Sequence, residues 1–81
     1  MEAEELDAII RESLPRWFGA GEPFSAPEVF ALLTDERSID VSPEDVYAAL
    51  DRLADKQAHG LRRLYGRHMP HWNQRYVQHA P

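Results

Sequence analysis

The residues best suited to chemistry lie at the C-terminal end of the 81-residue chain. Residues 61–81 contain four arginines and no aspartate or glutamate, whereas all 14 acidic residues lie in residues 1–60 beside five lysines and arginines. Guanidinium groups bind phosphate and carboxylate oxygens through paired hydrogen bonds. Although the net charge is −5, we expect an anionic partner to dock near this end. The four arginines are Arg62, Arg63, Arg67 and Arg75.

Histidines gather at the same end and raise the question of a metal site. His68 and His71 lie between the two basic segments, and they can be interpreted as loop polarity, a pH-sensitive contact or metal ligands. No acidic residue lies near them in the sequence, and the chain has no cysteine. We therefore expect no bound metal. The lack of cysteine also excludes disulfides, thiolate zinc sites and thiol nucleophiles.

Adjacent acidic pairs are the other candidates for chemistry, at Glu4-Glu5, Asp35-Glu36 and Glu44-Asp45. They lie at the ends of predicted helices, where negative charge stabilises the first turn or is simply solvated. Nothing in the sequence pairs them with a nucleophile or with the partner of an acid/base couple. We therefore expect neither an enzyme nor a cofactor.

The length limits the chain to a single domain, residues 1–81. A chain this short buries only about 60% of its unfolded surface, so most apolar positions are needed for the core. The N-terminus is acidic where a signal peptide is basic, and no apolar run approaches the roughly 18 residues of a membrane span. We expect an intracellular, cytoplasmic protein that does not contact a membrane.

Three amphipathic helices must position these residues, over about 3–18, 26–34 and 43–58. Apolar residues recur every three or four positions in the first of them, which ends near Ser13 or kinks there because Pro15 cannot donate a backbone hydrogen bond. The second begins with Ser25 and Glu28, and the third with Ser42 and Asp45, both in the pattern of a capping box. The second and third helices therefore have well-specified starts.

A hairpin over residues 61–79 is predicted after the helices. Two aromatic and β-branched runs, 61–65 and 72–78, flank a loop over 66–71. An isolated hairpin is marginal in water, so some of its apolar residues must pack on the helices. Which face packs inward stays open between Leu61, Leu64, Trp72, Tyr76 and Val77. We also expect a brief third strand over 22–24, and core positions for Trp17, Phe18 and Trp72.

This order of elements within this length is typical of a winged helix-turn-helix, an α+β fold that is mainly α with a small antiparallel hairpin. The stretch from Gly21 to Val77 also resembles the DNA-binding half of ferric uptake regulator-type repressors. The resemblance rests on the segments GEPFSAPEV, VSPEDVYAALDRL and GLRRL. It covers most of the chain but not that family's metal-binding dimerisation half. It implies the winged fold and a DNA contact by Tyr47, which otherwise is a half-buried aromatic.

The third helix has an unusual outer face for a helix that enters the major groove. It presents Glu44, Asp51 and Asp55, with only Arg52 and Lys56 as compensation, and acids near phosphates weaken binding. The hairpin is the more credible contact, and we expect a small transcription regulator, possibly a homodimer, that binds duplex DNA. The expected contact residues are Arg62, Arg63, Arg67, His68, Arg75, Tyr47 and Arg52.

A protein-interaction module is the alternative. The acidic excess over residues 1–60 suits a basic partner protein, and the fold class does not exclude this use. The interface residues would then be Glu44, Asp51 and Asp55 on the third helix.

Overall fold

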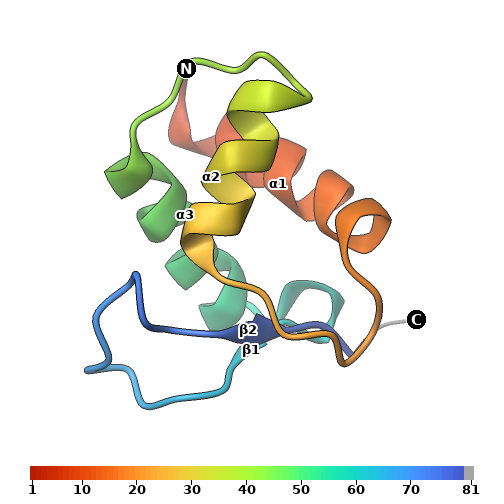
Figure 1. Ribbon diagram of the computed structural model, residues 1–81, viewed down its shortest axis with the longest axis vertical. Coiled ribbons are helices and arrows are strands. Elements are labelled where there is room, and N and C mark those ends of the chain that lie inside the picture. The colour runs from red at the N-terminus through yellow and green to blue at the C-terminus, as the bar shows by residue number, and fades with distance from the viewer. Residues whose placement is uncertain (80–81) are drawn as a thin grey trace.

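The structure is a computed structural model that describes residues 1–79, so residues 80 and 81 of the expected 1–81 domain lie outside the described residues. Within residues 1–79 there are three α-helices, a short 3₁₀-helix and a two-stranded antiparallel sheet (Figure 1). This confirms a mainly helical α+β architecture. The elements are α1 (Ala3–Trp17), α2 (Ala26–Asp35), α3 (Pro43–Asp55), η1 (Ala58–Gly60), β1 (Arg62–Arg63) and β2 (Tyr76–Val77).

Helix α3 is the central element, because it packs against α1, α2, η1 and β1. Its predicted start is confirmed: the Ser42 hydroxyl accepts a hydrogen bond from the Asp45 amide, and the Asp45 carboxylate accepts one from the Ser42 amide. Ser25 and Glu28 form the same capping box on α2. The inward-facing residues of α3 are fully or almost fully buried, and they are Val46, Ala49, Leu50 and Leu53.

Helix α1 continues through Pro15 to Trp17, which agrees with the predicted 3–18 and excludes an end near Ser13, one of the two alternatives for that position. Pro15 itself is exposed. A distant side chain contacts this end of the helix: the Gln78 amide donates hydrogen bonds of 3.0 Å to the Leu14 carbonyl and 3.2 Å to the Phe18 carbonyl. The Leu14 carbonyl also accepts from the Phe18 amide, so Gln78 adds a second hydrogen bond there and provides one to the Phe18 carbonyl just beyond the helix.

Three stacked aromatic rings join the N-terminal half of the chain to the sheet. Phe18 stacks on Phe24 with ring centroids 4.4 Å apart, and Phe24 stacks on Tyr76 at 5.9 Å. Backbone hydrogen bonds between Phe24 and Tyr76 form an isolated antiparallel bridge, which confirms a brief extended pairing before α2. Phe18 is buried as expected. Trp17 is partly buried, and its indole N–H donates to the Glu36 carboxylate.

The third helix is shorter than the predicted 43–58, because α3 ends at Asp55. Gln57 takes left-handed backbone angles (φ 54°), which no α-helix continues through, and η1 follows it. The paired strands are also shorter than the two predicted runs. Only the register Arg62↔Val77 and Arg63↔Tyr76 forms the ladder within the expected 61–79 hairpin.

The structure settles which hairpin residues pack inward. Leu61, Tyr76 and Val77 are buried, whereas the side of the hairpin that carries Leu64 and Trp72 is exposed. The expectation that Trp72 belongs to the core is wrong, since 62% of its surface is accessible. Trp72 lies in a turn outside the paired residues and is not part of the core cluster.

Burial of Tyr76 generates a pH-dependent prediction. Desolvation raises the pKa of the Tyr76 phenol to about 12 from the ordinary 10.0. The neutral form is favoured in the folded state, so this stabilisation is complete below about pH 10 and is lost as the pH rises toward 12. We expect Tyr76→Phe to keep its stability at pH 7 and to lose less than wild type between pH 10 and pH 12 in urea unfolding.

Tyr65→Phe is the matched control, because Tyr65 is 50% exposed on the hairpin. It should follow the wild-type alkaline curve. If Tyr76→Phe loses as much stability as wild type between pH 10 and pH 12, the alkaline loss of stability is not caused by Tyr76.

Candidate functional site

A cluster of ion pairs fastens the hairpin to α3. Asp51 and Asp55 lie one turn apart on the same face of α3, and the Arg63 guanidinium of β1 binds both. The Arg63 nitrogen atoms lie 3.0 Å from Asp51 Oδ1 and 3.1 Å from Asp55 Oδ1, and Arg63 also donates to the Asp51 carbonyl. Only 13% of the Arg63 side chain is exposed. Arg63 is therefore a structural residue of the hairpin base.

Arg67 extends the cluster from the hairpin loop, residues 64–75. Its guanidinium lies 2.7 Å from Asp55 Oδ1, and 72% of its side chain is exposed. The hydrogen bond from Arg67, together with that from Arg63, lowers the pKa of Asp55 despite the opposing effect of desolvation. Burial alone lowers the pKa of Arg63, but its hydrogen bonds to Asp51 and Asp55 outweigh burial and raise it. The Asp55 carboxylate and the Arg63 guanidinium are thus held in their charged forms.

His71 and Tyr47 cover the other edge of this cluster. The His71 Nε2 atom lies 3.5 Å from Asp51 Oδ2, and the imidazole packs on the Tyr47 ring with centroids 5.0 Å apart. His71 Nδ1 is buried and has no hydrogen-bond partner among residues 1–79. Tyr47 is half-buried, which agrees with its interpretation as a half-buried aromatic residue. His71, in contrast, was not among the predicted contact residues.

The base of the hairpin loop is fixed by the buried side chain of Gln74. Its Oε1 accepts from the Tyr65 amide at 3.0 Å, and its Nε2 donates to the carbonyl groups of Tyr65 and Gly66. Figure 1 shows the loop leaving the sheet toward the side on which α3 lies. The loop is therefore held next to α3 by Arg67 and His71, and Gln74 joins the two sides of its base.

The remaining predicted residues are distributed around the cluster rather than within it. Arg52 forms a paired hydrogen bond with Asp7 of α1, at 2.9 and 2.8 Å, so it is turned away from the hairpin. Arg62 donates to the His79 imidazole, and Arg75 donates to the carbonyl of Gln74. His68 and Glu44 are exposed.

Comparison of the chain with protein-family models, curated proteins and solved structures finds no match. In the part of the chain that the structure describes, no helix is long and apolar enough to cross a membrane. The same residues contain no group of three or more histidine, aspartate or glutamate side chains that could hold a metal ion.

The lowered pKa of Asp55 predicts an acid-dependent loss of stability. The carboxylate form is favoured in the folded state, so its contribution is present above the ordinary pKa of 3.8 and is lost as the pH falls through the lowered value. We expect Asp55→Asn to unfold a few degrees below wild type at pH 6, and the two melting temperatures to converge near pH 2.

Asp40→Asn is the control, because Asp40 is exposed and forms no ion pair with residues 1–79. It should stay close to wild type at pH 6. A difference between Asp55→Asn and wild type that is unchanged at low pH would show that the carboxylate charge is not responsible.

Proposed function

We propose that the chain is a winged-helix protein that binds duplex DNA through the hairpin loop and the adjoining face of α3. The order of helix, brief extended pairing, helix, helix and hairpin supports the winged fold. A homodimer that binds two DNA half-sites would increase the affinity of such a small contact surface.

The observation that carries this proposal is the internal neutralisation of the α3 acids. The negative charge of Asp51 and Asp55 would repel phosphates, but Arg63 and Arg67 already balance it. The other two arginines of residues 61–79 are Arg62 and Arg75, and that segment contains no aspartate or glutamate. Arg62 is exposed and donates to His79, and Arg75 is half-buried and donates to the Gln74 carbonyl, so neither forms an ion pair with an acid among residues 1–79. A positive excess therefore remains on the hairpin.

The two arginines that contact Asp55 have different parts in this proposal. Arg63 is largely buried and holds the hairpin, so its removal tests folding as much as binding. Arg67 is mostly exposed, and it can exchange the Asp55 carboxylate for a phosphate without disturbing the strands. The phosphate contacts are therefore assigned to Arg62, Arg67 and Arg75, with His68 and Tyr47 at the edges of the surface.

Duplex titrations at several salt concentrations test the proposal. We expect Arg67→Gln to weaken binding of a random-sequence duplex and to reduce the slope of log K against log salt by about one, because one phosphate contact is lost. Asp55→Asn should strengthen binding, since it releases Arg67 from its internal partner. Fluorescence anisotropy measures both changes, and the stoichiometry reports whether two copies bind.

Arg16→Gln is the matched control, because it removes the same charge from the exposed surface of α1. It should leave the salt slope close to that of wild type. The proposal fails if no duplex binds at low salt, or if Arg67→Gln and Arg16→Gln have equal effects.

Exposed apolar side chains on the hairpin favour a second candidate, a protein-interaction module for a basic partner. Leu64, Tyr65 and Trp72 are 38%, 50% and 62% exposed, and tryptophan and tyrosine are enriched in the centres of protein interfaces. Among the acids expected to face such a partner, Asp51 and Asp55 are engaged by arginines, which leaves Glu44 exposed beside them.

This second candidate predicts a single stoichiometric protein partner. Affinity capture should recover it with wild type and lose it with both Trp72→Ala and Glu44→Lys, because one removes the apolar anchor and the other reverses a charge. Glu12→Lys on α1 is the control for charge alone. Capture that is insensitive to Trp72→Ala would exclude the hairpin as the protein interface.

A further inference from the structure

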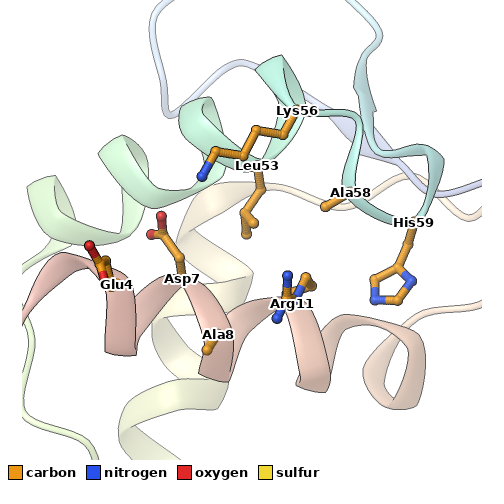
Figure 2. Close-up of a pocket in the computed structure, with 8 residues that line it drawn as sticks. All are labelled: Glu4, Asp7, Ala8, Arg11, Leu53, Lys56, Ala58 and His59. Atoms are coloured by element: carbon orange, nitrogen blue, oxygen red, sulfur yellow. The ribbon is translucent and has the colours of Figure 1, made fainter.

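A groove separates α1 from the C-terminal end of α3, on the flank of α3 away from the hairpin loop. It has a volume of about 580 Å³, within the range of small-molecule sites. Figure 2 shows the Lys56 side chain running back along α3 with its ammonium above Asp7, Arg11 on α1 below, and the His59 ring at the other end of the groove. Leu53 and Ala58 form its apolar wall.

The charges in the groove are unequally satisfied. Asp7 is bound to Arg52 through both carboxylate oxygens, so its charge is already balanced. The side chains of Arg11, Lys56 and His59 form no hydrogen bond or ion pair with any of residues 1–79. Glu4 and Asp7 oppose Arg11 and Lys56, and the Arg52 guanidinium bound to Asp7 adds a third cation at the edge of the groove, so one positive charge is left in excess in a chain of net charge −5.

The backbone that presents His59 is held in an uncommon conformation. Gln57 and His59 have φ angles of 54° and 53°, and Gly60 has φ 68°. Left-handed angles at residues other than glycine cost conformational energy and occur preferentially at functional sites. The turn is secured from outside, because the His79 amide donates to the His59 carbonyl and a Cβ at Gly60 would lie 3.0 Å from the Cβ of His79.

We propose that this groove binds a small phosphorylated ligand, with the phosphate between Arg11, Lys56 and His59 and the carbon skeleton against Leu53 and Ala58. Donors from three separate elements suit a tetrahedral oxyanion, and two full positive charges match a phosphate monoester dianion. The volume greatly exceeds that of a phosphate group, so there is room for an organic part. Its hydroxyl groups would donate to Glu4 at the opposite end of the groove.

Amide chemical shifts of the ¹⁵N-labelled chain test this site, with inorganic phosphate and ribose 5-phosphate as probes at constant ionic strength. Both should shift the amides of residues 7–11 and 56–60 in a saturable manner, and ribose 5-phosphate should bind more tightly. Arg11→Gln and Lys56→Gln should each weaken binding about fivefold, as expected for one charge-assisted contact at an exposed site.

Arg16→Gln removes the same charge from α1 outside the groove and should bind both probes like wild type. Shifts that do not saturate, or equal affinities for wild type, Arg11→Gln and Lys56→Gln, would overturn the proposal. A duplex oligonucleotide separates the two sources of phosphate. If the groove amides respond to the duplex but to neither small probe, the groove contacts a nucleic-acid backbone and the small-ligand proposal is wrong.

This inference is independent of DNA binding by the hairpin. The groove lies between α1 and α3, whereas Arg67 lies on the hairpin loop, so the effect of Arg67→Gln on duplex affinity does not depend on the outcome of the phosphate titration.

Discussion

The Arg63 guanidinium, held between two carboxylates one turn apart on α3, is the interaction on which the position of the hairpin depends. A ladder of two residue pairs is too short to be stable by itself. Burial of Leu61, Tyr76 and Val77 gives it an apolar anchor, but an apolar contact does not fix a direction. The paired charges fix β1 along α3, because Arg63 binds both Asp51 and Asp55, and the backbone bridge between Phe24 and Tyr76 fixes β2 on its other side. The position of β1 in turn determines where the following loop begins.

Local chemistry accounts for the parts of the fold that could be predicted. The capping boxes at Ser25 and Ser42 are complete within four residues each, and the apolar periodicity of α3 identifies its buried face. The errors have non-local causes. The C-terminal end of α1 is held by Gln78, which donates to the Leu14 carbonyl from 64 residues along the chain. Nothing in the residues around Pro15 indicates such a partner.

The candidate site shows the same division. The segregation of charge along the sequence identified the cations of the site but not their partners. The helical periodicity of α3 places Asp51 and Asp55 on its outer face, but it does not indicate which element packs against that face. The spacing of these two acids was the one local signal that a cation would bridge them. The role of His71 against Tyr47 and Asp51 required the path of the loop. Residue type alone predicted a core position for Trp72, but the path of the loop turns His71 toward α3 and leaves the neighbouring Trp72 62% exposed.

The separation between a buried and an exposed arginine bears on how such a surface would bind an anion. A guanidinium that is 13% exposed and bound to two carboxylates cannot give up its partners without leaving charges unpaired, which is costly in a desolvated site. Arg67, at 72% exposed, is screened by water, so the exchange of one carboxylate for a phosphate costs little. The same acid, Asp55, therefore anchors the hairpin through one arginine and competes with ligands for the other. Under the proposed function, the acids of α3 set the affinity for DNA without preventing it.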